Sequence, residues 1–388
     1  MPDLSKSLTV EDLRLLARRR VPRMFFEYAD HGGFTEQTYR ENQSDFEHIK
    51  LRQRIAVDIS DRSIATTILG EPVKLPLIIA PVGLLGMQDA DGEIKAARAA
   101  CKAGIPFCLS MMSICSVEDI AEHVGQPFWA QIYFTRDREF MTRFIARCRA
   151  ARVSALVLTM DRQVQGERHN ERRNGLSAPP RFTAKSVWNM ALRPGWSMRM
   201  LGTRRHNFRN IMGHATGTET LKRLSGWGEA QFDVPIPWDY VDWIRKQWDG
   251  PIVIKGLNDA EDARLAVEHG AQGMVVSNHG GRQLDGAPTT IRVLPEIIEV
   301  VNGRAEVYVD SGIRSGQSLL KAIALGAKAG MVGRGTAYAL GAGGEAGVTR
   351  MIEIISKELD ITMALCGERD VNNLGTYNIY SNDLRHGQ

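Results

Sequence analysis

The segment 277–286 contains the residue types in this chain that are best suited to chemistry. Its sequence is SNHGGRQLDG, and it directly follows the apolar run 273–276. The imidazole of His279 can accept a proton, and the guanidinium of Arg282 can hold a carboxylate through two hydrogen bonds. The two glycines between them permit a sharp turn and a close approach of backbone to ligand. The segment therefore predicts a site for a small organic acid.

Short apolar runs rich in β-branched residues recur eight times and could position this segment. They occupy residues 77–80, 107–109, 128–133, 155–159, 252–255, 273–277, 307–310 and 330–332. Amphipathic helical patterns such as 92–103, 138–150, 260–269 and 315–325 separate most of them. Eight βα units predict an α/β fold of the (β/α)8 TIM barrel type. A doubly wound sheet is the alternative, but no Gly-x-Gly-x-x-Gly turn follows an early strand.

The chain of 388 residues is expected to form one domain over residues 1–388. Its content of 43% hydrophobic and 24% charged residues is typical of a globular protein. We expect an N-terminal helical cap over 1–76, the barrel over 77–367 and a C-terminal tail over 368–388. An insertion at about 175–233 would interrupt the barrel between its fourth strand and fourth helix.

Nearly every expected strand ends in a polar group or is directly followed by one. Because barrel active sites form at the C-terminal ends of the strands, these residues should converge. They are Ser110, Gln131, Tyr133, Thr159, Asp161, Lys255, Ser277, His279, Asp310, Gly333 and Arg334. Any one of them alone could be an ordinary turn or cap residue, but together they predict one active site.

Glycine-rich turns follow the last two expected strands. They are DSGIRSG at 310–316 and GRG at 333–335. Barrels commonly hold a phosphate after strands seven and eight, where backbone amides and arginines can bind an anion. The two turns therefore predict a phosphorylated cofactor.

The chain resembles the FMN-dependent α-hydroxy-acid oxidases and dehydrogenases, and in particular their L-lactate dehydrogenase branch. The motifs that carry the resemblance are VPRM at 21–24, EY at 27–28, APVG at 80–83, QIY at 131–133, LTMD at 158–161, IKG at 254–256, SNHGGRQLD at 277–285 and DSGIR at 310–314. The match runs from about residue 21 to about residue 367. It implies FMN as cofactor and an L-2-hydroxy acid as substrate, with (S)-lactate as first choice and mandelate-like or longer acids as alternatives.

The resemblance also implies a role for each site residue. His279 would be the base in either a carbanion or a hydride route, with Asp161 orienting its ring and Tyr133 near the substrate hydroxyl. Tyr28, Arg282 and Arg168 would bind the substrate carboxylate, although Arg168 could equally serve a solvated face. The residues that would bind FMN are Val82, Gly83, Ser110, Gln131, Thr159, Lys255, Ser277, Asp310, Ser311, Gly312, Ile313, Arg314, Gly333 and Arg334. A cation such as Lys255 beside the flavin would stabilise the negative charge of its reduced form.

A few positions depart from the family's pattern. Val82 stands where the family often has Thr, and Gly83 stands where oxidases often have Ala. The glycine favours a dehydrogenase over an oxidase that makes H2O2. Met111 and Met112 stand where an aromatic residue often lines the pocket, so the preferred acid side chain stays open.

The insertion is both basic and apolar. Residues 172–217 contain no Asp or Glu, and nine Lys or Arg alternate there with Trp, Met and Leu. Such a segment suits an anionic membrane surface, and membrane-bound relatives carry their anchor there. We therefore expect peripheral membrane binding through residues 175–215, with a quinone or cytochrome as electron acceptor. A mobile cover over the active site is the alternative, and no nucleic-acid recognition fold accompanies the charge.

The remaining features bear on location and on other function classes. The five cysteines are odd in number and form no Cys-x-x-Cys pair, which argues against a disulfide framework and a zinc site. Residues 1–6 lack the apolar region of a secretory signal, so we expect a cytoplasmic protein, peripheral on the inner face of the cytoplasmic membrane. The resemblance implies a homotetramer. The alternatives are a soluble oxidase using O2 and a non-catalytic barrel that binds a phosphate ligand.

Overall fold

An eight-stranded parallel sheet forms the centre of the computed structural model, which describes residues 3–176, 183–215, 218, 231 and 235–380. The strand order is β4-β11-β10-β9-β8-β7-β6-β5, and a parallel bridge between Ile79 and Phe107 joins the two ends of the sheet. The strands are β4 Leu77–Ile79, β5 Cys108–Ser110, β6 Phe128–Tyr133, β7 Val153–Thr159, β8 Ile252–Leu257, β9 Gly273–Val276, β10 Glu306–Val309 and β11 Ala329–Val332. The predicted (β/α)8 barrel is confirmed, and the doubly wound alternative is wrong.

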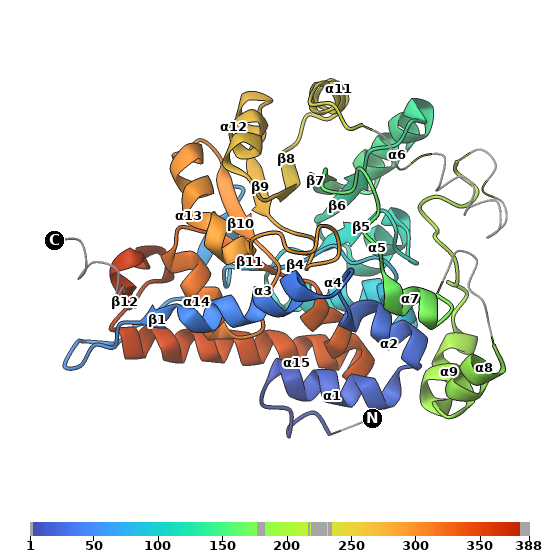
Figure 1. The fold of residues 1–388 in the computed structure, drawn as a ribbon, viewed down its shortest axis with the longest axis horizontal. Coiled ribbons are helices and arrows are strands. Elements are labelled where there is room, and N and C mark those ends of the chain that lie inside the picture. Colours follow the sequence, from blue (N-terminus) through green and yellow to red (C-terminus); the bar gives the residue numbers. More distant parts are fainter. Residues whose placement is uncertain (1–2, 177–182, 216–217, 219–230, 232–234, 381–388) are drawn as a thin grey trace.

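Helices surround the barrel and follow its strands (Figure 1). They are α4 Gly92–Ala103, α5 Val117–Val124, α6 Arg138–Ala150, α11 Asp239–Arg245, α12 Ala260–Glu268, α13 Thr290–Val301, α14 Gly316–Ala324 and α15 Arg334–Cys366. Local signals explain their ends: Asp137 accepts a hydrogen bond from the Phe140 amide at 2.8 Å, and Gly104 ends α4 with a φ of 67°. The long α15 is interrupted at Gly343 and Gly344, so its first part serves as the eighth barrel helix.

Alternate strand residues build two apolar cores. Residues facing the barrel axis, among them Val157, Val253 and Tyr308, form one cluster. Their neighbours along the strands, such as Leu158 and Ile254, pack outward against the helices. The hairpin of β2 Thr66–Ile68 and β3 Glu71–Val73 adds buried residues to the inner cluster and lies at the end of the barrel away from the C-terminal strand ends.

The N-terminal region is helical only in its first part. Its helices are α1 Val10–Arg20, α2 Arg23–Asp30 and α3 Gln37–His48, and α1 packs along α15 (Figure 1). Arg14 binds Asp30 through two hydrogen bonds of 2.5 and 2.8 Å and so ties α1 to α2. Beyond His48 the chain is extended: β1 Lys50–Leu51 pairs with β12 Ile379–Tyr380. Two short 3-10 helices, η2 Val371–Asn373 and η3 Thr376–Asn378, precede β12, and η1 Leu85–Met87 follows β4.

Helix α7 His169–Arg173 directly precedes the predicted insertion, and the described part of the insertion contains helices α8 Ala184–Ala191 and α9 Pro194–Gly202. Residues 177–182, 216–217, 219–230 and 232–234 of the predicted insertion lie outside the described part of the chain. Helices α8 and α9 lie at the edge of the molecule, beside α2 (Figure 1). Trp196 of α9 stacks on Phe25 of α2 at 5.3 Å, and its indole N–H donates to the carbonyl of Met87 at 3.0 Å. The insertion is thus attached beside the C-terminal ends of the strands.

Candidate active site

A cavity of about 1280 Å³ opens at the C-terminal ends of the barrel strands. The predicted site residues that line it are Tyr28, Val82, Gly83, Gln131, Tyr133, Thr159, Arg168, Lys255, His279, Arg282, Asp310, Ser311, Gly312, Arg314, Gly333 and Arg334. Ser110, Asp161 and Ser277 lie behind this lining and hydrogen-bond to Gln131, His279 and Lys255 respectively. The structure therefore brings the scattered strand ends into one place. Ile313 is the exception, because its side chain is 1% exposed and packs in the core.

His279 and Asp161 form a buried pair in the wall of the cavity. The carboxylate oxygens of Asp161 lie 3.0 and 3.1 Å from Nδ1 of His279. Because a carboxylate can only accept a hydrogen bond, Nδ1 carries the imidazole proton, and Nε2 is the nitrogen that can accept another proton. Gly256 makes room for the pair: β8 bulges there with a φ of 103°, and a Cβ would lie 2.5 Å from the Cβ of Asp161.

Burial lowers the pKa of His279 below its ordinary value of 6.5, while the charge of Asp161 acts in the opposite direction. Burial by itself would raise the pKa of Asp161, but the nearby His279 and Lys255 hold it below its usual range. His279 is therefore neutral near pH 7 and able to act as a base, with an ionised carboxylate ready to stabilise its protonated form.

The rate of flavin reduction should depend on pH in a direction that follows from these shifts. We expect it to fall as the pH drops through the lowered pKa of His279, so the midpoint of this acid limb should lie below pH 6.5. Asp161→Asn removes a charge that raises that pKa, so the limb should move to still lower pH and the maximal rate should fall. Stopped-flow measurements from about pH 4.5 to about pH 8 check both shifts. If the acid limb has the same midpoint pH in Asp161→Asn as in the parent, Asp161 does not interact with His279 in the way described.

Lys255 is a buried cation on the cavity wall. Its side chain lies on β8, is 6% exposed, and its Nζ is 2.5 Å from Oδ2 of Asp310 and 2.6 Å from Oγ of Ser277. Burial would lower its pKa, but Asp310 and Asp161 raise it above the ordinary value. Lys255 is therefore charged, and it can stabilise negative charge on a ligand in the cavity.

Two buried polar atoms show that the wall fits a flat polar ligand such as the flavin ring. Nε2 of Gln131 and Oγ1 of Thr159 have no hydrogen-bond partner within the part of the chain that the structure describes, and both residues are 1% exposed. Ser110 donates to Oε1 of Gln131 at 3.0 Å, so the amide nitrogen is the group left for a ligand. Unpaired buried polar atoms are costly, and a ring bearing carbonyl oxygens and nitrogens would satisfy them. The predicted flavin-binding residues thus fit that group.

The opposite side of the cavity suits a phosphate. Arg314, Arg334, Gly312 and Gly333 all line it there, beside the hydroxyl of Ser311. Gly312 has a φ of 129°, and a Cβ would lie 2.0 Å from a backbone oxygen of Asn42, so only glycine fits this turn. The Arg334 guanidinium donates to three carbonyl oxygens at 2.7 to 2.9 Å, which fixes its position at this edge.

Three charged side chains form the region predicted to hold the substrate carboxylate. Arg282 donates to the carbonyls of Tyr28 and His31 at 2.7 and 2.9 Å, and to Oε1 of Glu171 at 2.5 Å. Arg168 lies 3.6 Å from the same oxygen, and its side chain is 11% exposed, so it does not lie on a solvated face. Burial and the neighbouring Arg282 lower the pKa of Arg168 to about 10, which leaves it charged at neutral pH.

Glu171 is the site residue that sequence reasoning missed. It lies on α7, lines the cavity and is 13% exposed. One carboxylate between two guanidiniums leaves a net positive charge, which a substrate carboxylate can match. The spacing of Arg168 and Glu171, three residues apart at the start of a helix, is the signal that could have revealed the pair.

Gly83 also has a geometric role. A Cβ at this position would lie 3.1 Å from the hydroxyl oxygen of Tyr28 and 3.4 Å from the carbonyl oxygen of Met112. Both neighbours line the cavity, so even an alanine would press on its wall. The glycine noted in the sequence thus leaves space beside Tyr28.

Comparisons with known proteins agree with this site. A model of the FMN-dependent dehydrogenase family matches residues 17–381. The chain is 45% identical over 365 residues to the L-lactate dehydrogenase of Caulobacter vibrioides, which covers 93% of this chain and 94% of that protein. It is 43% identical over 361 residues to the L-lactate dehydrogenase of Pectobacterium atrosepticum, covering 93% of each.

Solved structures show the same likeness. The monotopic membrane protein (S)-mandelate dehydrogenase superposes with a TM-score of 0.91 at 34% identity, covering 96% of this chain and 99% of that one. A mandelate oxidase superposes with a TM-score of 0.80 at 34% identity, covering 96% and 98%. The sequence match, the fold and the residues of the cavity agree: the chain belongs to the FMN-dependent dehydrogenase family, and FMN is its cofactor.

Proposed function

We propose that the protein oxidises an L-2-hydroxy acid, (S)-lactate in the first place, to the corresponding 2-oxo acid. The observation that carries this proposal is the shared cavity of His279, paired with Asp161, and the two guanidiniums of Arg168 and Arg282. A base and a carboxylate-binding pair in one pocket suit a small acid with an oxidisable carbon beside its carboxylate. Relatives named L-lactate dehydrogenase at 42 to 45% identity support lactate as the acid.

The roles of the chain's own groups follow from their positions. Bound FMN supplies a two-electron acceptor. Arg282 and Arg168 hold the substrate carboxylate. Tyr133 lines the cavity and is placed near the substrate hydroxyl. His279 takes one proton from the substrate through Nε2, and Asp161 stabilises the resulting imidazolium. In either a carbanion or a hydride route, the positive charge of Lys255 stabilises the negative charge that develops on the cofactor side of the cavity.

A panel of acids tests the choice of substrate. L-lactate, D-lactate, L-mandelate and a longer aliphatic L-2-hydroxy acid are mixed in turn with the protein under anaerobic conditions, and flavin bleaching is followed. We expect L-lactate to bleach the flavin fastest and D-lactate not to bleach it. Faster bleaching by mandelate would support the second candidate, a mandelate-type dehydrogenase, which the structural likeness to (S)-mandelate dehydrogenase favours.

We further propose that the insertion binds an anionic membrane surface and that the enzyme passes electrons to a membrane quinone or a cytochrome. Helices α8 and α9 and the short connection between them expose five large apolar side chains, namely Val187 54%, Trp188 66%, Leu192 57%, Met198 72% and Leu201 85%. None of the helices in the described part of the chain is long and apolar enough to span a membrane. Binding at the surface, on the inner face of the cytoplasmic membrane, is therefore the proposed mode. The homotetramer implied by the family resemblance belongs to the same proposal.

The structure alters the expected role of the positive charges in the insertion. Arg199 pairs with Asp89, and Arg205 and Arg209 pair with Asp119, so these three cations bind acidic residues of the barrel. Lys185 and Arg204 remain exposed. The apolar residues of α8 and α9 therefore contribute more to the proposed membrane contact than the sequence pattern suggested.

A triple variant tests the membrane contact. Trp188→Ser, Met198→Ser and Leu201→Ser together should weaken binding to vesicles that contain anionic lipid by about a hundredfold or more, because each large apolar side chain contributes about 1.5 to 3 kcal/mol on burial. Ile55→Ser, at a side chain 83% exposed between β1 and β2, is the matched control and should change nothing. Equal sedimentation of the triple variant and the parent with vesicles would rule out this surface.

A further inference from the structure

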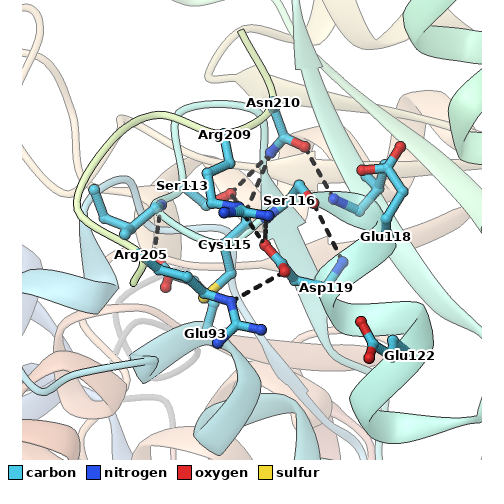
Figure 2. Close-up of polar contacts among 12 residues, drawn as sticks. Glu93, Ser113, Cys115, Ser116, Glu118, Asp119, Glu122, Arg205, Arg209 and Asn210 are labelled. Atoms are coloured by element: carbon cyan, nitrogen blue, oxygen red, sulfur yellow. Dashed lines mark hydrogen bonds and ion pairs between the residues drawn. The ribbon is translucent and has the colours of Figure 1, made fainter. Parts of the chain in front are cut away.

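The end of the insertion is attached to the loop between β5 and α5 by a polar cluster centred on the buried Asn210 and Asp119, which we call the clasp (Figure 2). On the insertion side it consists of Arg205, Arg209 and Asn210, and on the barrel side of Ser113, Ser116 and Asp119. Asn210 is fully buried, at 0% exposure. Its Oδ1 accepts from the Val117 amide at 3.0 Å, and its Nδ2 donates to Oγ of Ser113 at 2.9 Å. One amide thus binds both the loop and the first turn of α5.

Asp119 holds the two arginines. It is 4% exposed, its Oδ1 accepts from Nε of Arg205 at 3.0 Å, and its Oδ2 lies 2.9 Å from Nε of Arg209. The same Oδ2 accepts from the Ser116 amide at 2.8 Å, which closes the capping box of α5. Because a buried carboxylate is costly without partners, Asp119 strongly favours a conformation in which the insertion end stays attached.

The fastened loop leads directly to the cavity. Oγ of Ser110 accepts from the Met112 amide at 3.1 Å and donates to Gln131, a cavity-lining residue whose Nε2 has no partner among the described residues. The carbonyl of Met112 accepts from the Leu84 amide at 3.2 Å, next to Gly83. Met112 itself lines the cavity. Asn210 therefore lies behind a loop that carries one wall of the substrate pocket.

The insertion end also contributes to the wall itself. Arg205 and Arg209 bind Asp119. His206 and Phe208 lie between these two arginines in the sequence, and both line the cavity. Both arginines that flank this stretch are held by the same carboxylate, so the contacts with Asp119 also fix the short stretch between them that carries His206 and Phe208. The position of His206 and Phe208 relative to Met112 thus depends on the clasp.

We infer that the clasp determines which acid side chains the pocket accepts, with Asn210 as its central positioning residue. Asn210 does not line the cavity and therefore contacts neither substrate nor cofactor. It sets the distance between two walls of the pocket, one carrying Met112 and the other carrying His206 and Phe208. The inference rests on the proposed oxidation of a 2-hydroxy acid, and it assigns the size preference of that site.

Asn210→Ala tests the inference in the FMN-loaded, full-length protein. The flavin-reduction rate and the dissociation constant are measured by stopped flow for L-lactate and L-mandelate. Loss of a buried amide with several hydrogen bonds should lower the lactate-to-mandelate ratio of kred/Kd by about tenfold or more. The change should lie in the dissociation constants, with the limiting rate for lactate and the flavin content nearly unchanged.

Asn189→Ala is the matched control. Asn189 lies on α8 of the same insertion and accepts a hydrogen bond from the Arg23 amide at 2.8 Å, at the start of α2 and away from the β5–α5 loop. This variant also removes a hydrogen bond between the insertion and the rest of the chain, but it should leave the acid ratio unchanged. Equal ratios in the parent, Asn189→Ala and Asn210→Ala would overturn the inference.

A milder variant covers the case in which Asn210→Ala does not fold. Arg209→Gln removes one cation from Asp119 at a side chain that is 45% exposed, and it should shift the ratio in the same direction by a smaller factor. An unchanged ratio in Arg209→Gln would again overturn the inference. Failure of the parent protein to reduce its flavin with either acid would instead reject the proposed function, so the two failures are distinguishable.

Discussion

Replacement of His279 by glutamine is expected to slow flavin reduction by L-lactate by about a hundredfold to ten thousandfold, the usual contribution of a positioned general base. Glutamine can still hydrogen-bond to Asp161 but cannot accept a proton at neutral pH. The contacts that hold the cofactor side of the cavity involve Lys255, Gln131 and Thr159, so the variant should keep its flavin. Stopped-flow absorbance of the purified, yellow variant measures the effect.

His269→Gln provides the control for this variant. His269 follows α12, and its Nδ1 lies 2.9 Å from Oδ1 of Asp242 in a similar imidazole–carboxylate pair. It precedes β9 and thus lies at the end of the barrel opposite to the cavity. This variant should reduce its flavin at the rate of the parent. A rate within a few-fold of the parent for His279→Gln would reject His279 as the base.

Lys255→Met should give the second large effect. Removal of the cation leaves Asp310 buried without its ion-pair partner, which should destabilise the protein by about 3 to 5 kcal/mol. A neighbouring cation is worth about 4 kcal/mol to developing negative charge at an effective dielectric constant of 20, so flavin reduction should slow by about a hundredfold or more. Urea unfolding measures the first effect, and stopped flow with a redox titration measures the second.

A double variant separates the two consequences. Lys255→Met combined with Asp310→Asn removes both charges of the buried pair, so stability should largely return while flavin reduction stays slow and the flavin midpoint potential stays more negative than in the parent. Lys328→Met is the control, because Nζ of Lys328 contacts Thr66 just before β11, at the far end of the barrel. Recovery of the reduction rate in the double variant would show that Lys255 acts through stability alone.

The barrel could be predicted from the sequence because its strands are buried and short. Strands such as 128–133 and 252–257 are mostly apolar and are buried on both sides, since one side faces the inner core and the other faces the helices. Helix limits were also accurate where strong caps mark them, as at Gly104 and Asp137. Residues 49–76 were harder to predict, because β1 depends on pairing with β12 at the other end of the chain.

Much of the site could be predicted because a barrel brings its strand ends together. His279 and Asp161 are 118 residues apart in the sequence and meet because β7 and β9 flank the bulge at Gly256. Glu171 and the insertion side of the clasp could not be predicted in this way, because they lie outside the repeating strand–helix units that bring the strand ends together. In the sequence, Arg205 and Arg209 look like ordinary surface charges. Only the structure shows that both lie beside Asp119. The side chain of Ile313 lies in the core because its neighbours along the turn take the cavity side.

Reduction of the protein-bound FMN by an L-2-hydroxy acid, with His279 as the base, can be tested directly. The flavin is titrated anaerobically with L-lactate while its absorbance is recorded, and the acid products are then quantified. We expect complete bleaching with one pyruvate formed per flavin, and no bleaching by D-lactate. A flavin that stays oxidised with L-lactate and with every other L-2-hydroxy acid of the panel would contradict it.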